Sequence, residues 1–247
     1  MSDKKVVFSN YFFRDRLMGF ARGIMLKIYS RFPILSPNSR LCAAFRGKKI
    51  SVLDAGCGEG EQMYITRTIL PDAEITGVDV SCSLIYKDIG TFVACDLSKD
   101  KLPFTDESFD YVYSQHVIEH LEDPLHFIKE CKRVLKPGGV LYIECPDVRW
   151  TLLPHIPFIC GREGGFNFWD DPTHLRPWSR NALRKIAKMG GFRDEGIKTF
   201  YVRKWAHLLS FPLMFLSRND DYKVAFLHSL LGLWCGMKAR KLPLIRQ

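Results

Sequence analysis

The chain has 247 residues, of which 47% are hydrophobic, so it can bury one large core with appendages and is not a disordered protein. Its eight cysteines are scattered without a C-x-x-C pair. That pattern excludes zinc-ligand spacing and favours buried free thiols in a reducing, cytoplasmic compartment over a disulfide framework. The net charge of +9 is uneven: residues 1–49 carry +9, residues 50–175 carry −11 and residues 176–247 carry +11. Such basic flanks predict contact with a membrane surface or a nucleic acid.

The N-terminal segment, residues 1–47, is predicted to be basic and helical. Apolar residues at helical spacing with arginines alongside them occupy residues 11–29, which favours either an interfacial helix or a helix that packs on the sheet and covers a cofactor. Residues 1–9 lack the apolar core of a signal peptide. Pro33, Pro37 and the short polar run Ser36 to Arg40 are interpreted as a linker, and the main domain is predicted to begin at residue 48.

The stretch from Ile50 to Gly60 reads as a buried strand that opens into a glycine loop. Glycines at 56, 58 and 60 allow sharp turns and close backbone approach to a ligand, and a helix from Glu61 would point free N–H groups at it. The spacing is G-x-G-x-G after Asp54, rather than the G-x-G-x-x-G of dinucleotide sites. The loop therefore suits an adenosine-bearing cofactor.

Further strands follow in order. The second is predicted at residues 74–79 and ends in Asp79, whose carboxylate is placed to accept hydrogen bonds from two ribose hydroxyls. The third, at residues 92–96, ends in Asp96. The fourth begins at Phe109 and runs into a helical turn, and the fifth follows the turn at residues 137–139.

In this order, these stretches resemble the motifs of class I S-adenosylmethionine (SAM) dependent methyltransferases. The resemblance implies a Rossmann-like, doubly wound α/β fold with a seven-stranded, mostly parallel sheet, and SAM as cofactor. It assigns Asp96 to the adenine amino group, with a simple strand-end turn as the alternative. The cofactor-binding residues implied are Asp54, Gly56, Cys57, Gly58, Gly60, Asp79, Val80, Cys95, Asp96, Leu97, Ser114, Gln115 and His116.

After the fifth strand, residues 148–178 are rich in Pro, Gly and aromatic residues and are predicted to form a lid that shapes the substrate site. The lid ends in Asp170 to Ser179, which resembles the Asp-Pro-x-His stretch of many sugar- and lipid-modifying members of that family. Ser179 is predicted to cap a helix over residues 180–189.

Transfer to a hydroxyl needs a group that takes up its proton. The candidates are His116, Glu119, His120 and His174. These four could alternatively hold a divalent metal, as a similar Glu/His cluster does in the small-RNA 2′-O-methyltransferases that the stretch partly resembles. That family has an acid where this chain has His116, so the sequence predicts no resident metal.

The methyltransferase domain is predicted to end at residue 203, and residues 204–247 to form a basic, apolar helical segment. Its two apolar blocks, residues 205–216 and 224–235, are each about twelve residues long and bordered by Lys and Arg. They are too short to span a bilayer, which needs about twenty residues. They suit a helix pair in the headgroup region of an anionic membrane, with core helices or a dimer face as the alternative.

Together these features predict a SAM-dependent methyltransferase that O-methylates a lipid-linked, glycan or small hydrophobic acceptor, as a peripheral protein of the cytoplasmic membrane face. RNA is the alternative acceptor, disfavoured because the positive charge is interleaved with aliphatic runs rather than with stacking aromatics. A catalytically silent scaffold with the same fold is the other alternative. The oligomeric state is left open.

Overall fold

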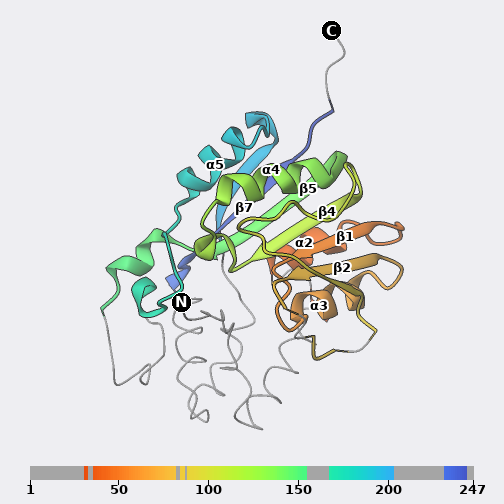
Figure 1. Cartoon of the computed structure of the whole chain (residues 1–247), viewed down its shortest axis with the longest axis horizontal. Coiled ribbons are helices and arrows are strands. Elements are labelled where there is room, and N and C mark those ends of the chain that lie inside the picture. The colour runs from red at the N-terminus through yellow and green to blue at the C-terminus, as the bar shows by residue number, and fades with distance from the viewer. Residues whose placement is uncertain are drawn as a thin grey trace.

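The computed structural model describes residues 31–32, 36–81, 84–86, 88–154, 167–202 and 231–243. Within them, seven strands form one sheet in the order β3-β2-β1-β4-β5-β7-β6 (Figure 1). The strands are β1 Ser51–Ala55, β2 Glu74–Asp79, β3 Thr91–Ala94, β4 Phe109–Gln115, β5 Leu135–Pro146, β6 Ile197–Val202 and β7 Trp234–Arg240. Strands β1 to β5 pair in parallel, whereas β7 runs antiparallel to both β5 and β6. The predicted seven-stranded, mostly parallel sheet is confirmed.

Helices cover both faces of this sheet. The described helices are α2 Pro37–Ala43, α3 Glu61–Ile69, α4 Pro124–Val134 and α5 Arg180–Met189, with shorter 3-10 turns η3 Ile118–His120, η4 Val148–Leu152, η5 Phe168–Asp170 and η6 Asp194–Gly196. Helices α2 and α3 pack on one core cluster, and α4 and α5 pack on another (Figure 1). The predicted start of α3 and the predicted bounds of β2 and α5 match the structure.

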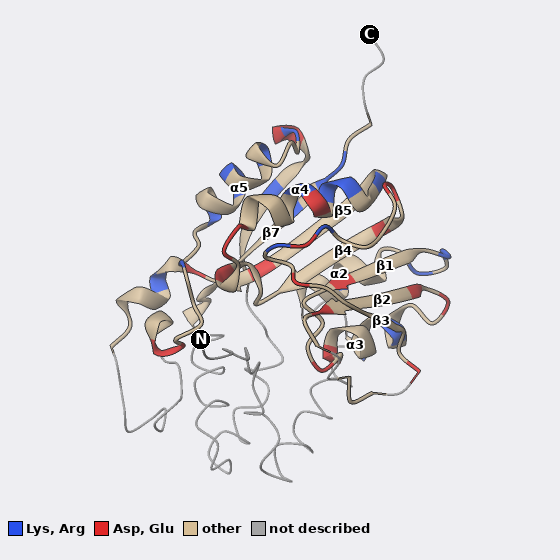
Figure 2. Ribbon diagram, in the orientation of Figure 1, with Lys and Arg blue, Asp and Glu red and all other residues tan. Residues whose placement is uncertain are grey.

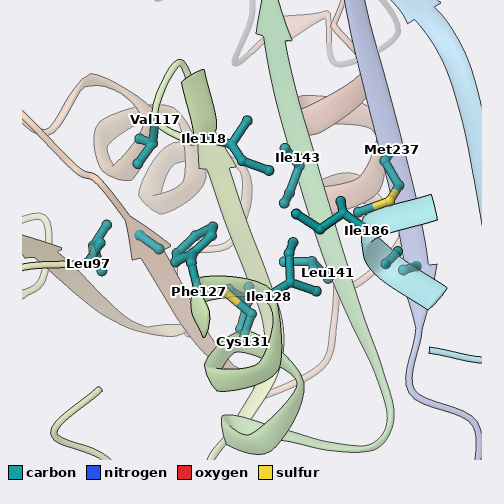
Figure 3. Packing of buried hydrophobic residues seen from close by; sticks show 14 of the residues in the cluster. Leu97, Val117, Ile118, Phe127, Ile128, Cys131, Leu141, Ile143, Ile186 and Met237 are labelled. Atoms are coloured by element: carbon teal, nitrogen blue, oxygen red, sulfur yellow. The ribbon is translucent and has the colours of Figure 1, made fainter. Parts of the chain in front are cut away.

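The larger cluster shows why α4 forms where it does. Asp123 accepts a hydrogen bond from the backbone N–H of His126 (2.9 Å), and Pro124 occupies the first helical position. The buried stripe of Phe127, Ile128 and Cys131 then packs against β5 and α5 (Figure 3). This packing fixes the strands whose carboxyl ends carry the candidate site.

The predicted linker at residues 36–40 is wrong, because Pro37–Ala43 form helix α2. Its polar residue Asn38 is buried with a partner: the hydroxyl of Tyr111 on β4 donates to Oδ1 of Asn38 (2.6 Å). Cys42 is fully buried in the core beside α3. The domain therefore includes α2 and begins before the predicted residue 48.

The predicted helical segment 204–247 also needs correction, because its residues 234–240 are β7, inserted between β5 and β6. In the register of β5 with β7, Cys235 lies opposite Cys145, and this stretch of β7 is buried. A short apolar run has no periodicity that distinguishes a buried strand from a buried helix. The predictions for residues 1–30 and 203–230 lie outside the described residues.

Among the residues that the structure describes, no helix is both long and apolar enough to cross a membrane.

Candidate active site

The strand order reverses between β1 and β4, and ligands of such sheets bind beyond the carboxyl ends of the strands at that point. The turn after β1 is the glycine loop. Gly56 adopts φ +87°, and a Cβ there would lie 2.2 Å from Cγ2 of Val117, which follows β4. A Cβ at Gly58 would meet no described atom within 4 Å. The loop thus packs tightly at its base and faces open space at Gly58.

Asp79, at the end of β2, braces this loop. One carboxylate oxygen accepts the backbone N–H of Gly58 (2.9 Å) and the other accepts that of Val80 (2.7 Å). Burial raises the pKa of Asp79, and these two hydrogen bonds oppose the rise. Each oxygen keeps a second lone pair. A ligand with hydroxyl donors can therefore bind at this carboxylate.

Asp54, the last polar residue of β1, lies beneath the loop with 2% of its surface exposed. Its Oδ2 atom has no hydrogen-bond partner among the described residues. The pKa of Asp54 is raised to about 8, mainly by burial. A hydrogen bond with Tyr113 opposes this rise, and the negative charge of Asp79 adds to it. A buried carboxyl that lacks a donor on one oxygen is suited to a ligand that brings one.

Of the other predicted cofactor residues, Cys95, Asp96 and Leu97 follow β3, Val80 follows β2 and Cys57 lies in the glycine loop. Oδ1 of Asp96 accepts the N–H of Ser98 (2.9 Å), so this side chain also forms a turn after β3. Cys95 and Leu97 are buried in the core, whereas Val80 is 47% exposed. Cys57 is likewise a core residue, against α3.

The turn after β4 carries His116 in a left-handed conformation, φ +55°. Its backbone N–H donates to the carbonyl of Glu144 on β5 (2.9 Å). Its ring lies between two fully buried carboxylates, with Nδ1 3.6 Å from Oε1 of Glu119 and Nε2 3.7 Å from Oε1 of Glu144. A non-glycine residue at positive φ is uncommon and marks a position where the surroundings enforce the geometry.

Glu144 was not predicted from the sequence. Its Oε2 accepts hydrogen bonds from the hydroxyl of Tyr142 (2.5 Å) and from the amide of Gln115 (2.9 Å). An acid inside the apolar run of a fully buried strand was the signal that could have identified it. Ser114, a predicted cofactor residue, is 1% exposed.

His120 and His174 lie next to each other at this edge of the sheet, although they are 54 positions apart in the sequence. Their ring centroids are 4.8 Å apart. The backbone N–H of Leu175 donates to the carbonyl of Glu119 (2.9 Å), which joins the Asp-Pro-x-His stretch to η3. The pKa of His120 is lowered, mainly by burial. The four candidate catalytic residues therefore lie in one neighbourhood.

Residues 53–143 match the family described as the methyltransferase domain. The chain carries a class I SAM-dependent methyltransferase domain.

Relatives of this domain serve different reactions. A probable SAM-dependent methyltransferase of Mycolicibacterium smegmatis is 31% identical over 58% of this chain and 52% of its own length. A tRNA U34 carboxymethyltransferase of Campylobacter curvus is 33% identical over 53% and 48%. A ubiquinone biosynthesis O-methyltransferase of Coxiella burnetii is 30% identical over 58% and 63%. The chain spans about half the length of most such relatives.

A SAM-dependent methyltransferase from Archaeoglobus fulgidus shares the fold of the whole methyltransferase domain. Its structure superposes with a TM-score of 0.57 at 20% identity, covering 92% of this chain and 100% of that one. The sheet that positions the glycine loop is thus a recurring one.

The buried carboxyl of the methyltransferase domain, Asp54, makes its stability depend on pH. The folded state holds this proton up to a pKa of about 8, whereas the unfolded state releases it near 3.8, so stability falls as pH rises between these values. Relative to wild type, Asp54→Asn should therefore gain up to about 1.4 kcal/mol of unfolding free energy per pH unit. Urea unfolding without ligand at pH 5.5 and 7.5 measures this, with Asp72→Asn on an exposed turn as control. Parallel pH profiles for wild type and Asp54→Asn would contradict the burial effect.

Proposed function

We propose that this chain binds SAM on the glycine loop and methylates an oxygen of a hydrophobic acceptor. The observation that carries the proposal is the Asp79 carboxylate, which braces Gly58 and Val80 at the edge where the strand order reverses. Asp79 would bind the ribose hydroxyls, and Asp54 and the loop N–H groups would bind the polar end of the cofactor. When bound, SAM supplies a methyl group on a sulfonium centre.

His116 is proposed as the group that takes the proton from the acceptor hydroxyl. Its ring is held between two buried glutamates, with one ring nitrogen 3.6 Å from Glu119 and the other 3.7 Å from Glu144. Its side chain is 38% exposed, so an acceptor can reach it, whereas both glutamates are fully buried. The O-methyltransferase among the relatives is consistent with a hydroxyl acceptor.

The residues next to His116, where the acceptor would bind, are largely apolar. Trp150 and Trp234 lie in a small cluster with Phe168, and the rings of Trp234 and His116 are 6.3 Å apart. Large apolar side chains are also exposed along the predicted lid: Val148, Leu152, Trp169 and Leu175, with Leu152 80% exposed. These contacts support a lipid-linked, glycan or other small acceptor with a hydrophobic portion.

Access to such an acceptor would come from peripheral binding at the cytoplasmic face of an anionic membrane. The apolar residues 205–216 and 224–230 lie next to Lys and Arg and support this from sequence, whereas residues 232–235 of the second block are buried at the start of β7. Figure 2 shows further Lys and Arg positions along α4 and β7. The same charges, and the tRNA-modifying relative, favour RNA as the second candidate acceptor.

Removing the Asp79 carboxylate tests the cofactor site. Asp79→Ala should weaken SAM binding at least tenfold, because it removes a charged acceptor from the ribose and a brace from the loop. Calorimetric titration with SAM measures this, with Asp72→Ala as matched control and NAD as the non-binding nucleotide. An unchanged affinity in folded Asp79→Ala protein would overturn the site assignment. No SAM binding by the folded wild type would favour the silent scaffold.

Replacing His116 separates proton uptake from cofactor binding. His116→Gln keeps a polar side chain of similar size but no proton acceptor of imidazole strength. Transfer should fall by about 10²- to 10⁴-fold, while the dissociation constant for SAM changes less than about threefold. Radiolabelled methyl transfer to a panel of phenols, polyprenyl alcohols and lipid-linked sugars measures the first, and calorimetry the second. Wild-type transfer rates in His116→Gln would exclude the assigned role.

Charge reversal tests the membrane proposal without truncation, because deleting residues 204–247 would remove β7 from the sheet. The double variant Arg218→Glu/Lys223→Glu should bind phosphatidylglycerol vesicles at least tenfold more weakly, since each basic residue near an anionic surface contributes about 1 kcal/mol. Lys185→Glu/Lys188→Glu on α5 is the matched control. Vesicle flotation reports the difference. Retention of a structured RNA by wild type that does not float would favour the RNA acceptor instead.

A further inference from the structure

Three donor side chains converge beside the proposed proton acceptor: Glu119 and His120 of η3, and His174 of the Asp-Pro-x-His stretch. One ligand atom from each lies within 4.8 Å of the other two. They come from two segments that backbone hydrogen bonding holds together, through Leu175 N–H and the carbonyl of Glu119. We propose that Glu119, His120 and His174 bind one divalent transition-metal ion.

Both histidines are oriented through Nδ1. Nδ1 of His174 is 2.6 Å from the carbonyl oxygen of Phe168, to which it can only donate. The Thr173 hydroxyl donates to Oδ1 of Asp171 (2.6 Å), so it accepts from Nδ1 of His120 (2.9 Å). In this tautomer each ring carries its lone pair on Nε2. Metal-binding histidines are oriented in the same manner, with the other nitrogen donating to a carbonyl or hydroxyl.

Glu119 supplies the second, independent observation. Its side chain is fully buried, and neither carboxylate oxygen has a hydrogen-bond partner among the described residues. Nδ1 of His116 lies 3.6 Å from its Oε1 atom, which is beyond hydrogen-bond length. A buried carboxylate in this state has lost its hydration without full compensation. A cation held between it and the two imidazoles would supply that compensation.

The donor set selects the kind of ion. Two imidazole nitrogens and one carboxylate, with coordination positions left for water or substrate, suit Zn²⁺, Mn²⁺, Fe²⁺ or Co²⁺ rather than Ca²⁺ or Mg²⁺, which prefer oxygen ligands. Donors bound at 2.0–2.2 Å to a tetrahedral ion lie about 3.4 Å apart. The observed donors, which lie within 4.8 Å of one another, therefore need to approach by about 1.4 Å at most to reach that spacing.

The role of the ion rests on the proposed function, although its binding does not. An open coordination position next to His116 would take an acceptor oxygen and lower the pKa of its hydroxyl, so that His116 removes the proton more readily. An acceptor with two neighbouring oxygens, such as a diol or catechol, would gain most from this arrangement.

Metal titration of the full chain tests the site without cofactor or acceptor. The protein is freed of metal with a chelator, dialysed, and titrated with Co²⁺, whose visible absorption reports bound nitrogen ligands; Zn²⁺ is then titrated by calorimetry. We expect one ion per chain. His174→Ala and Glu119→Gln should weaken binding at least tenfold, whereas His126→Ala, a half-buried histidine whose Nε2 lies 3.0 Å from the carbonyl of Asp100, should not change it.

Three results would overturn the proposal: no Co²⁺ bound by folded wild type, unchanged affinity in His174→Ala, or an equal loss in His126→Ala. If His174→Ala does not fold, His174→Gln, which keeps a hydrogen-bonding side chain of similar length, takes its place. Methyl transfer by metal-free protein distinguishes the two proposals. Transfer without any metal binding would refute the site and leave the proposed function standing, and metal binding without transfer to any acceptor would do the reverse.

Discussion

The parallel pairing of β1 with β4 is the constraint on which the rest of the site depends. Its register sets Asp54 opposite Tyr113, so the turns that follow the two strands must pack against each other. Only glycine fits at position 56, because any Cβ would overlap Val117. The loop that leaves β1 and the turn that carries His116 are therefore positioned by the same contact, which brings the proposed cofactor and acceptor sites together.

Buried carboxylates concentrate at this edge. Asp54, Glu119 and Glu144 are all almost fully buried, and they lie at or just beyond the carboxyl ends of β1, β4 and β5. Burial of several acids in one region costs stability, because each carboxyl group loses its hydration. Hydrogen bonds from Tyr142 and Gln115 offset part of that cost at Glu144. The remaining cost favours ligands that carry positive charge or donor groups, such as a sulfonium cofactor, a metal ion or an acceptor hydroxyl.

The cofactor half of this arrangement was predictable from the sequence, because local residue types determine it. Gly56 needs positive φ, Asp79 ends a short apolar strand, and α4 begins at an Asp-Pro cap, so each leaves a local signal. The same reasoning failed at α2, because Asn38 is buried through a hydrogen bond with Tyr111, 73 positions away. It also failed at β7, because the position of that strand depends on pairing with β5. Glu144 carried a local signal, an acid inside an apolar run, but the sequence alone did not show that Gln115 of the neighbouring strand β4 would be its partner.

The acceptor half lies largely outside the stretch shared with the family. Residues 53–143 include His116, Glu119 and His120, but Glu144, His174 and Trp234 follow them, and two of these come from the lid and from β7. The hydrogen bond from Leu175 to Glu119 joins the family-matched part to the later segment. A common loop can thus bind the same cofactor in many relatives, while the proposed acceptor site also depends on the segment that brings His174 to η3. Differences in acceptor among related methyltransferases are therefore expected to arise in this returning segment rather than in the glycine loop.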